Sequence, residues 1–242
     1  MNQLLGKVLE AYGGVERWRS ISSIRARGHV SGLLPRRFPG TKLANVTFDI
    51  HTAGQRTVIG GFPHPGSQAV FDDGEVRIQT DNGEPIASRS DPRAAFFGIQ
   101  GVRRNFRWDP LDTAYFAGYA SWNYLTAPFL LTGDGVQVSE GKPWTERGET
   151  WRRLHAEFPA GFHTHSAHQT FYIDSEGLIR RHDFVAEAVG KWASAALYCD
   201  DHRQVDGRTF AHWRRVLPRG PGGRSLPKPI LLTLTFDTIE VA

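Results

Sequence analysis

Apolar residues follow a helical spacing at the start of the chain and a strand spacing afterwards. Residues 2–12 carry apolar side chains three and four positions apart, which predicts an amphipathic helix. Gly13 and Gly14 end this helix, as glycine does just past a helical C-terminus. A short turn carrying Trp18 follows, and the period then changes to two.

Alternating apolar and polar residues predict half-buried strands in both halves of the chain. The alternation is clearest at residues 24–30 and 46–51, and the closing run at 230–239 is apolar on one face. The segment before that run, RGPGGRSLPK at 219–228, is expected to be a flexible loop. Turn signals rich in glycine and aspartate separate the other runs, at residues 72–74, 81–83, 147–148, 159–161, 174–177 and 206–207.

The middle of the chain has the pattern of helices. The dipeptides at 91–92 and 109–110 are both Asp-Pro, which places a capping residue before a proline that suits the first helical turn. The second dipeptide opens a helix rich in aromatic residues over 109–127. Pro128 then kinks or ends that helix.

The order of elements is therefore helix, strands, aromatic helix and strands, without a composition break or an internal repeat. A sheet of many antiparallel strands curls and must cover its inner face. The 242 residues, 40% of them hydrophobic, can bury a sizeable core. We predict one domain over residues 1–242, of a mainly β (α+β) class: a large curved antiparallel β half-barrel with an N-terminal helix and a central helical lid.

The cysteine content and the length of the apolar runs indicate in which cellular compartment the protein is located. Cys199 is the sole cysteine, so no internal disulfide can form, which is typical of a reducing environment. Residues 1–14 lack the basic start and unbroken apolar run of a secretory signal. No segment reaches the ~18 uninterrupted apolar residues that cross a bilayer. We therefore expect a cytoplasmic protein without stable membrane insertion.

The net charge of +4 and the pI of about 9.4 raise the question of nucleic-acid binding. Paired arginines, however, are spread along the chain. Neighbours on a strand point to opposite faces, so such pairs do not form one basic stripe. Because nucleic-acid binding needs that electrostatic footprint, no nucleic-acid partner is predicted.

Two segments resemble the bacterial lipoprotein-sorting carriers and related lipoprotein-like or lipocalin-type half-barrels. The first is AYGGVERWRSISSIRARG at 11–28, in which a helix ends at Gly-Gly and a Trp precedes the first strand. The second is QTFYIDSEGLIRRHDF at 169–184, a hairpin whose first strand ends at Asp and whose second begins at Gly-Leu. The chain is also similar to uncharacterised bacterial proteins of the same length.

The resemblance implies an open β half-barrel with a helical lid that holds an acyl chain or a similar ligand. Two features depart from the family. Those carriers are exported to the periplasm, whereas this sequence shows no export signal. The cavity helix is also more aromatic, and the second half richer in histidine, than lipid carriage requires.

Half of the ten histidines fall in one stretch, and they are His163, His165, His168, His182 and His202. His163 and His165, two apart on a strand, would share a face, a spacing compatible with metal chelation. Neither a cysteine nor a carboxylate stands beside them at the usual spacing. No metal is therefore predicted, and a surface or loop cluster is favoured.

Tyr198 and His202 share one face of their strand by period two, and Arg180 and His182 share one face of theirs. Where these faces coincide, a cavity wall would carry His182, Tyr198 and His202 as catalytic acid–base residues. Arg180 would lie beside them as a ligand contact. The alternative is a solvent-facing polar side, which is normal for antiparallel strands.

The aromatic helix offers a similar choice. Tyr115, Tyr119 and Trp122 lie four and three apart, on one helical face. They are either core residues or a stripe that stacks on a flat or polyene-like ligand. With Phe171 of the QTFYID strand, they are the candidate ligand-binding residues.

Motifs of two common chemistries are missing from the sequence, which has no glycine-rich phosphate loop and no GxSxG elbow. We predict that the partner is a hydrophobic or aromatic small molecule, bound in the concave cavity without a cofactor. The main hypothesis is acid–base catalysis of the isomerase, cyclase or lyase type. The alternatives are a non-catalytic carrier of a lipid-like ligand and a plain interaction module.

Overall fold

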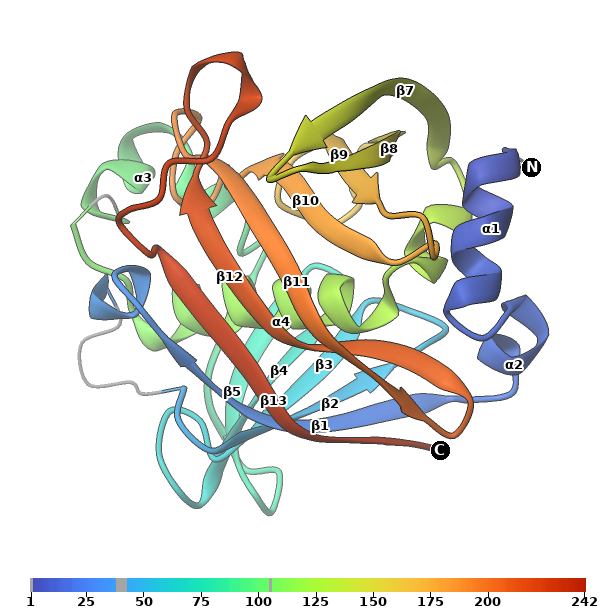
Figure 1. Ribbon diagram of the computed structural model, residues 1–242. Helices are drawn as coiled ribbons and strands as arrows, with labels where there is room; N and C mark the ends of the chain where they lie inside the picture. The colour runs from blue at the N-terminus through green and yellow to red at the C-terminus, as the bar shows by residue number, and fades with distance from the viewer. Residues whose placement is uncertain (1, 38–42, 105) are drawn as a thin grey trace.

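Thirteen strands form one continuous antiparallel sheet in the computed structural model, which describes residues 2–37, 43–104 and 106–242. The sheet curves around a long helix (Figure 1). The strands are β1 (Ser23–Ser31), β2 (Val46–His51), β3 (Arg56–Gly60), β4 (Ser67–Asp72), β5 (Glu75–Thr80), β6 (Pro85–Ser90), β7 (Gln137–Glu146), β8 (Glu149–Glu157), β9 (His168–Ile173), β10 (Ile179–Val185), β11 (Ser194–Val205), β12 (Arg208–Pro218) and β13 (Leu232–Val241). The α-helices are α1 (Gln3–Ala11), α2 (Val15–Arg19), α3 (Gly98–Arg104) and α4 (Pro110–Thr126), and the 3-10 turns are η1 (Leu34–Arg37), η2 (Ala94–Phe96), η3 (Phe129–Thr132) and η4 (Pro221–Gly223).

Both halves of the chain are up-and-down meanders that meet at the ends of the sequence. The strand order is β6-β5-β4-β3-β2-β1-β13-β12-β11-β10-β9-β8-β7. The first strand, β1, pairs with the last, β13, through partners such as Ile24 and Val241. This large curved antiparallel half-barrel is the predicted fold, and the prediction of the fold class is confirmed.

The alternation predicted for the first strands sets which face of the sheet is buried. On β1, Ile24 and Ala26 are buried, whereas Arg25 between them is exposed. On β2, Phe48 and Ile50 are buried in the same way. These inner-face side chains join those of α1, α4 and the second half of the sheet in one apolar core. Removing that apolar surface from water is the main stabilising contribution to such a fold.

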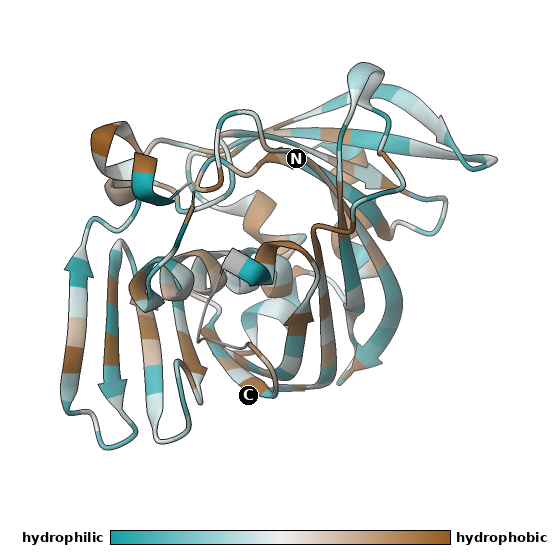
Figure 2. Cartoon of the chain, turned by 90° about the vertical axis from the view of Figure 1, so that its left-hand side faces the viewer, coloured by the Kyte–Doolittle hydropathy of each residue, from teal (hydrophilic) through white to brown (hydrophobic). Residues whose placement is uncertain are grey.

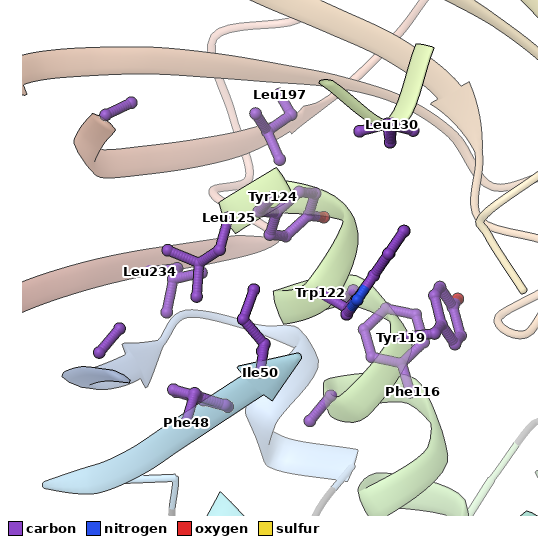
Figure 3. Close-up of a cluster of buried hydrophobic side chains, with 14 of the residues drawn as sticks. Phe48, Ile50, Phe116, Tyr119, Trp122, Tyr124, Leu125, Leu130, Leu197 and Leu234 are labelled. Atoms are coloured by element: carbon purple, nitrogen blue, oxygen red, sulfur yellow. The ribbon is translucent and has the colours of Figure 1, made fainter. Parts of the chain in front are cut away.

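The helix predicted over 109–127 crosses the inner face of the sheet as α4 (Figure 1). The carboxylate of Asp109 caps it by accepting a hydrogen bond from the backbone N–H of Asp112 at 2.9 Å. The helix ends at Thr126, two residues before Pro128. All residues from 112 to 126 are buried, so α4 is a core helix with side chains between β2, β11 and β13 (Figure 3).

α4 lies closest to the sheet at Gly118. A Cβ atom at this position would lie only 2.5 Å from the Cβ of Phe71 on β4. The carbonyl of Gly118 also accepts a hydrogen bond from the hydroxyl of Thr57 on β3 at 3.0 Å. The first half of the sheet is therefore in direct contact with the helix, because glycine presents no side chain there.

Two predictions, one of a loop and one of a helix start, differ from the structure. The segment 219–228, predicted to be a flexible loop, contains η4 and is fixed by backbone hydrogen bonds at 2.8 Å from Gly220 N–H to Arg224 and from Leu226 N–H to Pro218. The Asp-Pro pair at 91–92 starts only one 3-10 turn, η2. Asp91 caps that turn by accepting from the N–H of Ala94 at 3.1 Å.

Candidate ligand-binding cavity

A cavity of about 430 Å³ separates α4 from the second half of the sheet. This volume lies within the range of sites that bind one drug-sized ligand. α4 contributes Phe116 and Tyr124 to its wall, and the facing strands contribute Ala195, Val216 and Leu232. The wall is therefore predominantly apolar.

Small side chains create this space. The stretch that enters β11 carries Ala193, Ser194 and Ala195, and all three line the cavity together with Ala186. These side chains are too short to reach α4, so a space remains between α4 and the second half of the sheet. The first half of the sheet, by contrast, contacts α4 directly. A cluster of alanines in residues 186–196 is the sequence signal that could have located the cavity.

His165 and Tyr124 are the titratable side chains that reach the inner wall, and they bind each other. The Nε2 of His165 lies 2.8 Å from the hydroxyl of Tyr124, and its Nδ1 lies 3.2 Å from the hydroxyl of Tyr119. The imidazole also stacks on Phe184, with 3.9 Å between ring centroids. Both ring nitrogens are thus occupied within the protein.

Burial keeps this group of side chains neutral. Desolvation lowers the pKa of His165 well below its usual value, and the neighbouring His182 and Arg93 add to the effect. Desolvation likewise raises the pKa values of Tyr119 and Tyr124. At neutral pH these inner side chains are uncharged, and Arg219, which pairs with Asp183 at 3.5 Å, is the charged side chain that lines the cavity.

His182, the first predicted acid–base residue, is buried on the inner face beneath the cavity. It stacks on Phe171 at 4.1 Å, and its Nε2 lies 2.5 Å from Oε1 of Gln169. Desolvation, followed by the nearby Arg214, lowers its pKa to about 3. Its register partner on β11 is Leu197, so Tyr198 is on the opposite face.

Tyr198 and His202 do not share a face, contrary to the prediction. Asp201 between them has φ of 53° and is skipped in the β11–β12 register. The register is the same on both sides of Asp201, so no residue is inserted, and its left-handed backbone turns the later side chains toward the other face. Tyr198 lies on the outer face, where it packs with Tyr172, while His202 turns inward to within 3.3 Å of the hydroxyl of Tyr12.

The remaining predicted ligand contacts also lie outside the cavity. Tyr115 binds His163 through its hydroxyl at 3.0 Å, and Trp122 donates its indole N–H to the carbonyl of His51 at 2.8 Å. With Tyr119, they are buried core residues, which was the alternative considered for this stripe. On the same helix, Phe116 and Tyr124 line the cavity instead (Figure 3).

Phe171 and Arg180 are also separated from the cavity. Phe171 lies in the core against His182. Arg180 falls at a register shift of β10 and points toward two carboxylates, Asp200 at 3.3 Å and Asp174 at 3.8 Å. Sequence reasoning therefore located the correct helix and sheet, but not the lining residues.

A buried ion-pair cluster on the outer face was not predicted. The Arg181 guanidinium, fully buried, binds Asp183 through two hydrogen bonds of 2.7 and 2.9 Å and also contacts Glu146 at 2.5 Å. The rings of Tyr172 and Tyr198 lie 4.7 and 5.7 Å from its central carbon. Its charge is compensated within the protein, so the cluster is structural.

His163 and His165 do not form a chelating pair. They lie in the loop before β9 and bind different tyrosines of α4. Among the described residues, no group of three or more histidine, cysteine, aspartate or glutamate side chains is arranged to hold a metal ion. In the same part of the chain, no helix is long and apolar enough to cross a bilayer.

Fold and cavity together define a β half-barrel with an internal apolar cavity, and solved structures share the fold. A LolA superfamily protein from Nitrosomonas europaea aligns over 97% of this chain and 92% of its own, with a TM-score of 0.52 and 7% identity. A DUF1329 family protein from Desulfovibrio piger aligns over 98% and 91%, with a TM-score of 0.51 and 11% identity.

A domain described as an outer-membrane lipoprotein-sorting protein, from Vibrio parahaemolyticus, aligns over 98% and 91%, with a TM-score of 0.51 and 10% identity. The resemblance to lipoprotein-sorting carriers is thus confirmed as a resemblance of fold. No protein-family model matches the sequence, and no curated protein matches it.

Proposed function

We propose that this protein binds one hydrophobic small molecule in the cavity between α4 and β11–β13 and carries it without changing it. The observation that carries the proposal is the cavity of about 430 Å³ with its apolar wall. Such a cavity favours an apolar ligand, because burying apolar surface contributes about 25 cal/mol per Å².

The side chains on the wall favour a carrier over an enzyme. A general acid or base must be free to exchange a proton with the ligand near the working pH. Both nitrogens of His165 are occupied by Tyr119 and Tyr124, and burial holds its pKa far below neutrality. The predicted trio of His182, Tyr198 and His202 is divided between two faces of the sheet.

The structural neighbours support a lipid-like ligand. One of them is described as an outer-membrane lipoprotein-sorting protein domain, and another belongs to the LolA superfamily. Their identity to this chain is 10% and 7%, so they suggest the class of ligand by analogy of fold.

The test is uptake of a fluorescent fatty acid by the wild type and by Ala195→Trp. Ala195 is 2% exposed and lines the cavity, so a tryptophan there fills the space. We expect the wild type to bind the fatty acid with one-to-one stoichiometry and the variant to lose binding. The matched control is Ile59→Val, a buried change in the core outside the cavity, which should bind normally.

Thermal unfolding separates loss of the cavity from loss of the fold, since the variant must remain folded for its result to count. Equal uptake by Ala195→Trp and the wild type would refute the proposed site. Native mass spectrometry then identifies the ligand retained from the producing cell. Recovery of that ligand in a chemically altered form after incubation would favour the catalytic hypothesis instead.

The cytoplasmic location expected from the sequence stays a prediction. Cell fractionation of the producing organism tests it. A periplasmic location would agree better with the sorting carriers that share the fold.

A further inference from the structure

Exposed hydrophobic side chains are concentrated in four segments of the chain. In the described residues, nine large hydrophobic side chains are exposed, and only Ile86 lies outside these segments. The most exposed are Ile99 at 93%, Phe106 at 82% and Trp192 at 73%. The other five are Leu33, Phe97, Val102, Leu226 and Ile230. Single exposed apolar residues are normal, but eight gathered together mark an interaction surface.

Positive charge is concentrated in the same segments. Residues 31–36, 97–104, 106–107, 188–193 and 219–232 contain eight arginines and lysines and no aspartate or glutamate. Because the whole chain carries +4, the rest of it carries −4. Although the arginine pairs are scattered along the sequence, positive charge is therefore distributed unevenly between these segments and the rest of the chain. We call these segments the basic rim.

Three segments of the basic rim meet at the mouth of the cavity. Leu33, Trp192 and Pro229 come from different segments, and all line the cavity. Leu33 is 44% exposed and Trp192 73% exposed, so the cavity reaches the surface between them. The exposed apolar residues therefore surround an opening into the apolar interior.

The fourth segment, with α3, is attached beside this mouth. Before α3, Arg93 donates a hydrogen bond to the carbonyl of Thr164 at 2.7 Å and binds Glu187 at 2.5 Å, next to the lining residues His165 and Ala186. After α3, Trp108 packs on the lining residue Phe116 at 5.2 Å.

Both views agree with this arrangement. α3 and η1 lie at the left of Figure 1, opposite α1 and α2. Figure 2 faces this left-hand side and shows brown, hydrophobic segments of α3 and η1 next to teal, hydrophilic ones. The rim segments with α3 and η1 thus lie on one side of the molecule, and the loop between β12 and β13 lies at the top of Figure 1.

We propose that the basic rim docks on an anionic lipid bilayer. Apolar side chains interleaved with cations are the combination that enters the headgroup boundary of such a surface. Three of the eight rim cations pair with acidic side chains, Arg103 with Asp109, Arg104 with Asp112 and Arg219 with Asp183, and Glu187 is bound by Arg93. The other five, Arg36, Arg107, Lys191, Arg224 and Lys228, supply the positive charge of the docking surface. A nucleic acid would use the cations but leave Ile99 and Phe106 in water, and it is therefore the less suitable partner.

Docking of this kind is peripheral. No described helix spans a bilayer, so contact rests on side chains that enter the headgroup layer. The proposal goes beyond ligand carriage, because vesicle binding requires only the rim and not an occupied cavity.

The experiment is flotation of the ligand-free full-length protein with vesicles of phosphatidylcholine alone or of phosphatidylcholine and phosphatidylglycerol in equal parts. We expect the wild type to float with the anionic vesicles and much less with the neutral ones. The double variant Ile99→Ser/Phe106→Ser should lose most of this binding. Its matched control is Ile86→Ser, the exposed hydrophobic residue outside the rim, which should bind like the wild type.

The contribution of the rim cations to vesicle binding is tested with a triple variant, Arg107→Glu/Lys191→Glu/Lys228→Glu. All three side chains are exposed on the rim. Each cation near an anionic membrane contributes about a five-fold gain in affinity, so the triple variant should bind at least about 100-fold more weakly.

A control with the same net charge reverses exposed cations elsewhere, namely Lys7→Glu, Arg19→Glu and Arg27→Glu. This control should keep most of the vesicle binding, whereas an equal loss in both triple variants would overturn the proposal. So would a wild type that floats with neither vesicle, or one that binds a DNA duplex through the rim cations and ignores anionic vesicles. The cavity variant Ala195→Trp should still float, which separates failure of the carrier proposal from failure of this one.

Discussion

Acid should destabilise this protein well before its carboxylates titrate, because desolvation holds at least three histidines in neutral form. His165 and His182 are buried in the core, and His202 is half-buried beside Tyr12. Desolvation is the largest cause of each shift, and it lowers the pKa of His182 to about 3 and that of His202 to about 4. In the unfolded chain each returns to its usual value of 6.5.

The direction in which the free energy of unfolding changes with pH follows from proton linkage. A folded-state pKa below that of the unfolded chain means that unfolding takes up a proton as the pH falls below 6.5. The stabilising contribution is therefore complete above pH 6.5 and is lost progressively toward the folded-state pKa. Between pH 7 and pH 5 each such histidine lowers the free energy of unfolding by about 2 kcal/mol.

Three histidines together lower the free energy of unfolding by about 6 kcal/mol, against a total of about 5–15 kcal/mol for a typical domain. The carboxylates of Asp109 and Glu146 do not explain a loss in this window, because their pKa values are lowered from 3.8 and 4.5. Urea unfolding followed by tryptophan fluorescence at pH 7, 6 and 5 measures the effect.

The variant His182→Phe isolates one titrating group. It should lower stability at pH 7, because Oε1 of Gln169 loses its partner, but it should also reduce the pH dependence, by at most about one third because other histidines contribute as well. Ile179→Val on the same strand should cost about 1 kcal/mol at every pH and leave the slope unchanged. A free energy of unfolding that is equal at pH 7 and pH 5, or a His182→Phe slope equal to that of the wild type, would refute the reasoning.

Three further predictions concern other parts of the fold, each measured by urea unfolding at pH 7. Arg181→Met removes the closest cation from the buried carboxylate of Asp183, which keeps only the Tyr172 hydroxyl and Arg219 at 3.5 Å. This should cost about 3–5 kcal/mol, and adding Asp183→Leu should recover part of the loss. Gly118→Ala should destabilise the protein although alanine improves helix propensity by about 1 kcal/mol, because overpacking against the Cβ of Phe71 costs about 1–3 kcal/mol. Asp109→Ala removes the cap of α4 and should cost about 1–2 kcal/mol, whereas no loss would mean that the cap is dispensable.

Regular strands were predictable because their alternation has a single period. β1 and β2 follow it, and Ile24 and Phe48 are buried as expected. The rule failed on β10, where the register shifts at Arg180, and on β11, where Asp201 has a left-handed backbone without a register shift. A register shift depends on the partner strand, and a left-handed residue inside a strand redirects the side chains that follow it. The acid–base wall was therefore divided by a feature that a single strand's sequence does not encode.

The aromatic helix shows a second limit. Periodicity assigns a face when one side of a helix meets water, but residues 112–126 of α4 are buried all round. The sequence therefore could not distinguish Tyr115 and Tyr119, which bind the 163–165 loop, from Phe116 and Tyr124, which line the cavity. The cavity also depends on small side chains that do not reach the facing helix, and such residues follow no periodic pattern in the sequence.

The two proposals, taken together, make ligand uptake and membrane docking interdependent. Leu33 and Trp192 line the cavity, and both are also exposed on the basic rim. A ligand that contacts them from inside changes the apolar surface they present outside, and a bilayer that covers them changes the mouth through which the ligand passes. Linkage requires that the coupling be reciprocal, so the ligand must change vesicle affinity by the same factor as vesicles change ligand affinity. The coupling itself arises because the small side chains of β11 place the cavity next to the rim segments that carry the cations.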